Sequence, residues 1–451
     1  MSVKEPLSNF CDENNLRFYL IDCGSGLMHL IVFPDETVML FDCNVTNDNE
    51  ELILTFLEKH IPEKYDIETE NYEKYIDVFV NSHRDEDHYR GLKKVNSNHK
   101  IKSIWDSGQS GESTASDDYN YYMNLRRTLK KKSTDNLLVP IPTDTVLQSF
   151  GDAEIYCLAA EANFVESTKE SQILEFAAKI QHTNSMVLLI IYSGRKLLLT
   201  GDSDWKSWRE QIAPNFSDKE INFENTDILI ASHHGSRSFF TDEETIDLDT
   251  YPDTTYIESI SSINPVITLI SCADYDYKNY HLPNKEAMKL YEQYTSEGKQ
   301  QIHTTHTHGT LCGFIDGNGN YGVIPYRFRN KMPEVDKKFF IKCYKIKDEV
   351  RTEVESGSEV EVGYRLKFSV IGLGDVINTK DSIKVFWQVC NVGMDYDYEH
   401  NEIYYKGEDE ADDKYSFSRE LSYKGIHLLR CRLVNNSKNF DGTLVFVVRG
   451  V

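Results

Sequence analysis

The most constraining feature of this chain is a polar segment, residues 82–88, that follows directly on a short apolar run, residues 75–81. The run is rich in β-branched and aromatic residues, which predicts a buried strand. The segment carries side chains of the kind that bind metals: His83, Asp85, Asp87 and His88. In a helix only His83 and Asp87 would share a face, whereas a loop can turn the whole set toward one point. The chain must therefore fold around a strand whose end presents a cluster of ligands.

Imidazole and carboxylate ligands together suit zinc, manganese or iron, and so many in one loop suit two ions better than one. The alternative is a solvated, charged loop that caps a strand. Residues of the same kind recur at later strand ends, so we favour metal binding. We expect two divalent metal ions, zinc or manganese, with magnesium as a third option.

Further candidate ligands stand beside other expected elements. Asp202 comes just after one apolar run, His182 stands before another, and His281 stands before a helical pattern. His182 is explained equally well by a core or capping role. Three more histidines look like a metal tract but fit an exposed strand end equally well, and we leave them out of the site: His303, His306 and His308.

We assign the ligands in two sets with one shared member: His83, Asp85 and His182 for the first ion, Asp87, His88 and His281 for the second, and Asp202 for both. A carboxylate can bridge two ions because it has two oxygens. His233 or His234, at the end of another strand, would protonate a leaving group. Gly235 and Ser236 would contact the substrate, since a glycine lets the backbone approach a phosphate closely. Asp87 counts as catalytic as well as a ligand.

The charge of the chain bears on the substrate. The formal net charge is −24 over 451 residues, and such a field repels nucleic acid at long range. One basic cluster opposes it, on a helix expected to begin near Asp117: Arg126, Arg127, Lys130, Lys131 and Lys132. A solvated helix face explains this cluster slightly better than an arm that contacts phosphates beside the site.

Cysteine usage and hydropathy indicate the compartment. The nine cysteines are scattered and never spaced as Cys-x-x-Cys, which indicates reduced thiols. The longest apolar run, residues 186–192, is far too short to cross a bilayer. The N-terminus has no apolar signal core. We expect a cytoplasmic protein without a membrane partner, and the oligomeric state stays open.

The order of expected elements is a β-meander, a helix, a strand and a helix, and then the same again. This order predicts an α/β fold with a two-layered β core between helices. An acidic stretch with one Gly-Ser step, residues 348–363, is expected to be a linker. It would separate a catalytic domain, residues 1–347, from a β-rich domain, residues 364–451, that has the alternation of a small β-sandwich.

These motifs resemble the metallo-β-lactamase fold, in particular its DNA-uptake competence (ComEC-like) branch. The matching segments follow the order of that branch: residues 21–26, 81–88, 184–185, 199–202, 233–236 and 280–283. The resemblance implies an αββα sandwich and metal-dependent hydrolysis of phosphodiesters or esters. Arg90 departs from the small residues usual at its position, so it is expected to narrow or recharge the substrate cleft.

The last part of the chain resembles the C-terminal sensor domain associated with bacterial antiviral nucleotidyltransferases (the adenylyl/guanylyl cyclase and SMODS sensor). The matching segments are residues 386–393, 406–407 and 419–427. The resemblance implies nucleotide sensing, with four candidate ligand contacts: Trp387, Asn391, Tyr423 and His427. The alternative is a β-sandwich in which Trp387 is simply a core residue.

Together the two resemblances imply a metal-dependent nuclease or phosphodiesterase of bacterial antiviral defence. A nucleotide activator or a partner protein would act on its C-terminal domain. A second hypothesis keeps the chemistry and makes the substrate a small phosphodiester or cyclic nucleotide, which the acidic charge favours. A third hypothesis is a sensor or assembly module with a vestigial site. The choice among DNA, RNA and small phosphodiesters stays open, as does the identity of the metal.

Overall fold

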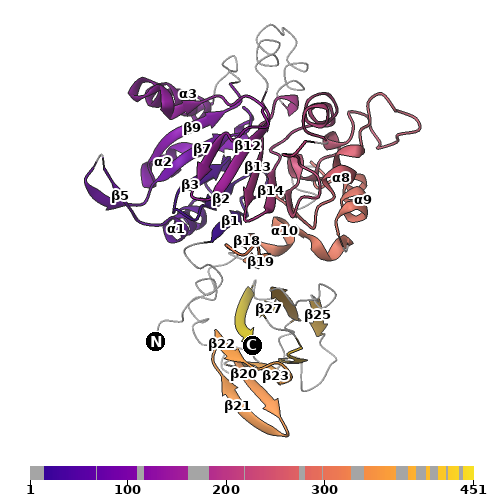
Figure 1. Cartoon of the computed structure of the whole chain (residues 1–451). Helices are drawn as coiled ribbons and strands as arrows, with labels where there is room; N and C mark the ends of the chain where they lie inside the picture. Colours follow the sequence, from indigo (N-terminus) through magenta and orange to yellow (C-terminus); the bar gives the residue numbers. More distant parts are fainter. Residues whose placement is uncertain are drawn as a thin grey trace. The chain divides into compact units, whose positions relative to one another are not determined.

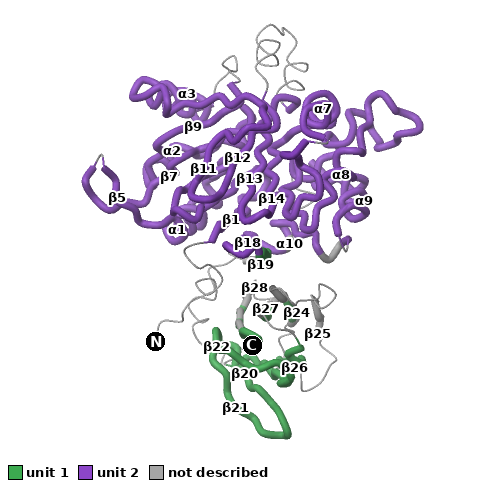
Figure 2. The backbone as a smooth tube through the Cα atoms, viewed as in Figure 1, with its two compact units in different colours: residues 1–12, 320–451 green, residues 13–319 purple. Residues whose placement is uncertain are grey.

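The protein is described by a computed structural model (Figure 1). The described residues are 15–67, 69–108, 116–160, 182–217, 219–273, 280–296, 298–326, 340–371, 384–392, 403–406, 415–422, 425–435 and 440–451. The chain forms two compact units that divide between Gly319 and Asn320 (Figure 2). We call residues 13–319 the larger unit and residues 320–451 the smaller unit. Among the described residues, no helix has the length and apolar character needed to span a membrane.

The first sheet of the larger unit carries the predicted metal loop at the end of a parallel strand. Within residues 13–319 its strands follow the order β10-β9-β7-β3-β2-β1-β18. Their bounds are Leu137–Leu138, Ile101–Asp106, Ile76–Asn81, Val38–Phe41, His29–Val32, Leu16–Leu20 and Thr310–Ile315. β3 runs parallel to β7 with Phe41 opposite Val80, so the two strands end at the same edge of the sheet.

The second sheet of the larger unit repeats this arrangement. Its strands follow the order β11-β12-β13-β14-β15-β16-β17. Their bounds are Gln148–Phe150, Ala153–Ala159, Val187–Tyr192, Arg195–Leu199, Ile228–Ile230, Ile267–Ile270 and Ile302–Thr304. β14, β15 and β16 are parallel neighbours. The loops that follow these three strands therefore leave from one edge of the sheet.

Helices flank the strands on both sides, which makes the larger unit a mixed α/β structure. Figure 1 shows α1, α2 and α3 on one side and α8 and α9 on the other. The α-helices are α1 (Glu50–His60), α2 (Leu92–Asn98), α3 (Asp117–Lys132), α6 (Trp205–Ser207), α7 (Ala213–Phe216), α8 (Glu258–Ile263), α9 (Lys285–Tyr294) and α10 (Thr305–His308). In the core beside the second sheet, Trp208 lies edge-on to Phe223, at a ring separation of 5.2 Å.

The larger unit also contains two short strand pairings and several short helical turns. β4 (Cys43–Asn44) pairs with β8 (Tyr89–Arg90) directly beyond the metal loop. β5 (Lys64–Asp66) and β6 (Asn71–Glu73) form a separate hairpin. The 3₁₀ turns η2 (Glu86–His88) and η5 (Ser232–Gly235) contain predicted site residues.

In the smaller unit every described regular element is a strand. The first sheet has the order β21-β20-β23-β26 and the second β22-β28-β27-β24-β25. The strands are β19 (Tyr321–Tyr326), β20 (Phe340–Lys347), β21 (Val350–Val354), β22 (Ser358–Val360), β23 (Arg365–Ile371), β24 (Lys384–Val392), β25 (Ile403–Lys406), β26 (Ser416–Glu420), β27 (Gly425–Asn435) and β28 (Phe440–Gly450). Side chains from both sheets share one core, in which Phe368 contacts Phe417 and Phe446.

The predicted linker at residues 348–363 is part of this unit, and the predicted domain boundary is therefore wrong. Half of its residues lie in β21 and β22, and β20 pairs with β23 from within the smaller unit. The first four side chains of β21 are exposed, because β21 is an edge strand of its sheet. An exposed edge strand that carries charged residues resembles a solvated linker in composition. The boundary at 319/320 lies well before the acidic stretch.

Candidate metal centre

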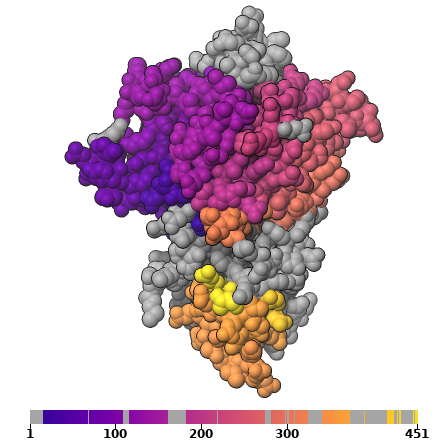
Figure 3. Space-filling view, in the orientation of Figure 1, coloured from indigo at the N-terminus to yellow at the C-terminus, as the bar shows by residue number. Residues whose placement is uncertain are grey.

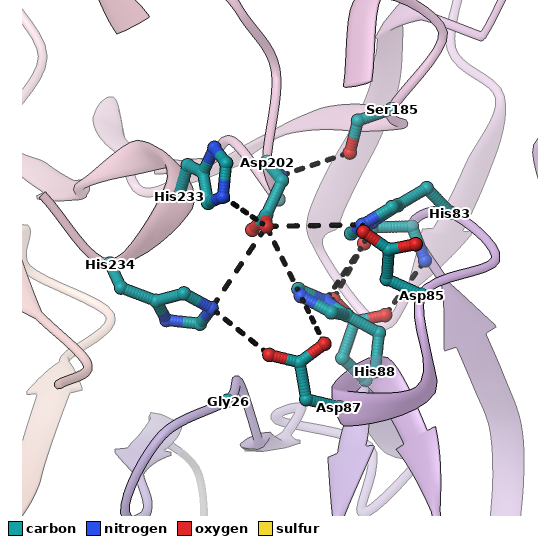
Figure 4. A network of polar contacts seen from close by, with 12 residues as sticks. Gly26, His83, Asp85, Asp87, His88, Ser185, Asp202, His233 and His234 are labelled. Atoms are coloured by element: carbon teal, nitrogen blue, oxygen red, sulfur yellow. Dashed lines mark hydrogen bonds and ion pairs between the residues drawn. The ribbon is translucent and has the colours of Figure 1, made fainter. Parts of the chain in front are cut away.

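The loops that follow strands of the two sheets of the larger unit meet at one polar centre (Figure 4). His83, Asp85, Asp87 and His88 come from the loop after β7, and Asp202 from the loop after β14. His182 stands a few residues before β13, and His234 lies in η5 after β15. The parallel strands explain the meeting, since their ends point to the same edge.

The first group of potential ligands consists of His83, His182 and Asp202, whose ligand atoms all lie within 4.8 Å of one another. The Nε2 atom of His83 lies 3.8 Å from Oδ2 of Asp202 and 3.3 Å from Oδ2 of Asp85. His182 Nε2 lies 3.0 Å from the same Asp85 oxygen. The structure thus brings together every residue predicted for the first ion, including His182.

The second group consists of Asp87, His88 and His234, with the same closeness of ligand atoms. His234 Nε2 lies 3.7 Å from Oδ2 of Asp87. Oδ2 of Asp202 lies 3.3 Å from Nε2 of His88 and 3.9 Å from Nε2 of His234. Asp202 therefore faces both groups, which is the position predicted for a bridging carboxylate.

His281, which was predicted to complete the second group, belongs to neither group and is exposed. In the second group, His234 occupies the position that was predicted for His281. The backbone is left-handed at His234 (φ 57°) and at the exposed His281 (φ 52°) alike, so this conformation does not separate the two residues. The His234 ring lies toward Asp87. Which of two histidines on different loops points inward depends on the path of each folded loop, and composition does not reveal it.

The orientation of the three inner histidine rings fits a metal centre. The Nδ1 atoms of His83, His88 and His234 hydrogen-bond to Ser82 Oγ, Asp42 Oδ2 and the Ser271 carbonyl at 3.0, 2.7 and 3.0 Å. Their Nε2 atoms are buried and have no hydrogen-bond partner. The same is true of Oδ1 of Asp202. Buried polar atoms without partners are costly. A cation at the point that they face would satisfy all of them, so the donor set fits divalent ions.

Asp42 is a further residue of the centre that the sequence did not indicate as functional. It follows β3, has a φ of 58° and is fully buried. Its carboxylate accepts hydrogen bonds from the Ser82 backbone N–H and hydroxyl, each at 2.7 Å, and from His88. A carboxylate behind a ligating imidazole fixes its tautomer and raises its basicity. The parallel register of β3 and β7 was the signal that could have revealed Asp42.

Gly201 shows how closely the two halves of the unit approach beside Asp202. It has a φ of 51°, and a Cβ atom there would lie 2.6 Å from the Ser185 hydroxyl and 2.8 Å from the Ser82 Cβ. The same Ser185 hydroxyl accepts a hydrogen bond from the Asp202 backbone N–H at 3.0 Å. Only glycine fits this turn, and this close approach places Asp202 over the metal loop.

Opposite charges hold the centre together. Burial raises the pKa of Asp202, but His88, His233 and His234 outweigh that effect and lower it well below its usual range. Burial lowers the pKa of His88, but Asp202 and Asp42 outweigh that effect and raise it well above its usual range. Asp202 therefore stays ionised at neutral pH, as a metal ligand must.

His233 lies beside the centre but outside both groups. Its Nδ1 is 2.7 Å from the Ser238 hydroxyl, and its Nε2 is 3.5 Å from Oδ2 of Asp202. Burial lowers its pKa to about 3. His234 joins the second group, so His233 is the one of the two predicted proton donors that belongs to neither group.

The predicted substrate contacts lie around the centre. Arg90 donates to Asn44 Oδ1 at 3.0 Å and lies 3.7 Å from a carboxylate oxygen of Glu86. Gly235 packs against Pro283, whose Cβ would lie 2.7 Å from a Cβ at position 235. The Ser236 hydroxyl accepts hydrogen bonds from the backbone and the hydroxyl of Ser238. The closeness at Gly235 thus serves the packing of the loop itself.

In the smaller unit the predicted sensor residues have different environments. Trp387 is fully buried and stacks on Phe417 with ring centroids 5.7 Å apart, as expected for a core residue. Asn391 pairs with His427 across β24 and β27. His427 and Arg419 are polar residues in the lining of an otherwise largely apolar cavity between the two sheets. Tyr423 lies outside the described residues.

Comparison with known proteins supports part of this picture. A family model described as the adenylyl/guanylyl and SMODS C-terminal sensor domain matches residues 323–445. This match confirms the predicted likeness of the C-terminal part, and it begins close to the structural boundary at 319/320. No curated protein matches the chain.

Among solved structures, one match is Igni18, titled a novel metallo hydrolase, from the archaeon Ignicoccus hospitalis KIN4/I. It is 10% identical, has a TM-score of 0.32, and the match covers 69% of this chain and 100% of that one.

Proposed function

We propose that this protein is a metal-dependent hydrolase of phosphodiesters, acting as a nuclease. The observation that carries the proposal is the pair of ligand groups that share Asp202. A second support is the arrangement of the larger unit, in which two sheets lie between helices, as in the αββα sandwich of the metallo-β-lactamase fold.

The residues that would hold the ions are those of the two groups, with Asp85 beside the first. When bound, two divalent ions would supply positive charge that neutralises a scissile phosphate and would make a hydroxide nucleophile available near neutral pH. Asp42 and Ser82 hold the His88 and His83 rings in place from behind. His233 would donate a proton to the leaving group, and its hydrogen bond to Ser238 would orient the ring.

We further propose that the smaller unit regulates this activity, as part of bacterial antiviral defence. The support is the match of residues 323–445 to a sensor domain. A sensor works when its ligand binds one activity state more tightly than the other. A nucleotide or a partner protein bound to the smaller unit would fill that role.

A small phosphodiester or a cyclic nucleotide is the second candidate substrate. The formal net charge of −24 favours it, since long polyanions are repelled by such a field. The third hypothesis, a sensor module with a vestigial site, is the least favoured. A decayed site would not be expected to keep both ligand groups and the Asp42 carboxylate behind them.

The test is to incubate the full chain with Mn²⁺, Mg²⁺ or Zn²⁺ and a panel of DNA, RNA, cyclic dinucleotides and bis(p-nitrophenyl) phosphate. We expect metal-dependent cleavage that EDTA abolishes and that an Asp87→Ala variant lacks. An Asp35→Ala variant is the control, because Asp35 lies in the turn between β2 and β3, away from the centre. Cleavage of no phosphodiester by a fully metal-loaded protein would overturn the proposal.

A further inference from the structure

The basic residues of α3 separate into an inward and an outward set. Arg126 points inward, where it and the Tyr122 hydroxyl bind the buried carboxylate of Asp106 at the end of β9. The other basic residues of the helix are exposed: Arg127, Lys130, Lys131 and Lys132. Arg127, Lys130 and Lys131 lie within about 100° of one another around the helix axis, and we call these three residues the α3 basic face.

The helix that carries this face is attached directly to the metal loop. Tyr89, the residue after the ligand His88, stacks on Tyr122 with ring centroids 5.4 Å apart and an interplanar angle of 14°. The backbone N–H of Gly91 donates to Asp118 at 3.0 Å. α3 therefore starts beside the centre and carries its basic face away from it. Figures 1 and 3 show α3 as a projecting part of the larger unit.

The charge of the α3 basic face contrasts with that of the whole protein. The formal net charge of the chain is −24, yet α3 has no acidic residue after Asp118. Lysines in a last helical turn also complement the helix dipole. That role does not explain Arg127, which precedes the last turn, and it does not explain why the basic stretch lies on a helix that is attached to the metal loop.

We propose that the α3 basic face binds the phosphate backbone of a nucleic acid strand that extends from the metal centre, so that the substrate is a polynucleotide. This inference rests on the proposed function and selects among its substrates. From Tyr122 to Lys131 the helix advances about 13 Å at 1.5 Å per residue. A nucleic acid strand presents a phosphate about every 3.4 Å along its axis. A small phosphodiester or a dinucleotide is too short to reach the face.

The test compares two full-length variants that each lose two exposed positive charges from helices of the larger unit. K130Q/K131Q removes them from the α3 basic face, and K59Q/K289Q removes them from α1 and α9. The second variant is a matched control, because Lys59 also lies in the last turn of its helix. A general loss of helix stability or of net charge would affect both variants alike.

Two substrates and one binding assay separate the outcomes. We expect K130Q/K131Q to lose about tenfold or more in kcat/KM for a single-stranded 20-mer at low salt. The slope of log(kcat/KM) against log(salt concentration) should become shallower by about 1.4, because two phosphate contacts to a single strand are lost. Its hydrolysis of bis(p-nitrophenyl) phosphate should be unchanged, and K59Q/K289Q should resemble the wild type throughout. Equal behaviour of the two variants on the 20-mer would overturn the inference.

Fluorescence anisotropy with a labelled 20-mer keeps the inference testable by itself. The wild type should bind the 20-mer more tightly than a dinucleotide, and K130Q/K131Q should lose that preference. If bis(p-nitrophenyl) phosphate is cleaved but the 20-mer is neither bound nor cleaved, the inference fails and the proposed hydrolase stands. If nothing is cleaved but the binding difference is present, the proposed function fails and the binding surface stands.

Discussion

The Nδ1 atom of His88 donates a hydrogen bond to Oδ2 of Asp42 at 2.7 Å, and both side chains are fully buried. This contact connects the end of β3 to the metal loop after β7. It leaves Nε2 of His88 directed toward Asp202. The carboxylate therefore decides which nitrogen of His88 is available to an ion.

Replacing Asp42 should weaken metal binding without removing a ligand. We expect Asp42→Asn to lower metal affinity by about 10- to 100-fold, the usual cost of losing such a supporting carboxylate. Titration with a competing chelator would measure it. An affinity equal to that of the wild type would show that Asp42 acts only in folding of the loop.

Asp87 and Asp202 should differ in how many ions their loss releases. Asp202 faces both groups, whereas Asp87 belongs to the second alone. We therefore expect Asp87→Ala to lose one ion and Asp202→Ala to lose both, each with loss of hydrolysis. Elemental analysis of the purified variants gives the stoichiometry. Full metal content and full activity in Asp87→Ala would contradict the assignment of the metal loop.

His233 and His234 should separate in the same assay. His234→Ala should lose metal because its ring belongs to the second group, whereas His233→Ala should keep it. Burial lowers the pKa of His233 to about 3, and the negative charge of a bound phosphodiester raises it again. For a poor leaving group we expect His233→Ala to reduce turnover roughly a hundredfold, the scale of a general acid. A good leaving group needs no proton, so equal losses for both kinds of substrate would exclude the role.

The boundary between the units predicts which truncation keeps a working core. A chain that ends at Gly319 should be folded and loaded with metal, because the larger unit holds every ligand of the two groups. A chain that ends near residue 350 keeps β20 without its partner strands β21 and β23, and such an unpaired strand promotes aggregation.

The activity of the shorter chain, with and without candidate nucleotides, tests regulation by the smaller unit. We expect the full-length protein to respond to one of these nucleotides and the chain ending at Gly319 to respond to none. A soluble, metal-loaded core that behaves as the full chain does under every ligand would make the smaller unit a docking module instead.

His29 should make the protein sensitive to acid. It is fully buried in β2, neither ring nitrogen has a hydrogen-bond partner, and burial lowers its pKa to about 3. Between pH 6.5 and 3 the unfolded chain binds a proton that the folded chain does not, so stability falls as the pH falls. In the wild type His29 should lower the free energy of unfolding by up to about 1.4 kcal/mol for each pH unit of acidification in this range. We expect His29→Phe to remove this decrease. Urea unfolding at pH 7 and pH 5 measures it, and a constant difference between wild type and variant would contradict this.

The sequence was sufficient to locate most of the centre, for reasons that lie in its local chemistry. The metal loop follows an apolar strand, and Asp202 follows another, so residue type and position relative to strands were enough. His234 could not be distinguished from His281 in the same way, because both have left-handed backbones and the path of each folded loop decides which ring turns inward. Asp42 is visible only in the register of β3 beside β7.

The domain boundary was missed for a related reason. The charged residues of β21, Arg351 and Glu353, face solvent at the edge of a sheet, and nothing local distinguishes such a strand from a linker. Its identity depends on pairing with β20, which itself pairs with β23 across intervening residues.

The ligands of each group come from segments that are far apart in the chain, which has a consequence for the lifetime of the protein. His83 and Asp202 leave different sheets, as do His88 and His234. Ions bound between them would join the two sheets as covalent cross-links do in secreted proteins, while the described cysteines carry no disulfide. Anything that binds only the folded state also stabilises it. Chelation would then expose the larger unit to proteases, so that the metal supply of the cell would set how long each molecule survives.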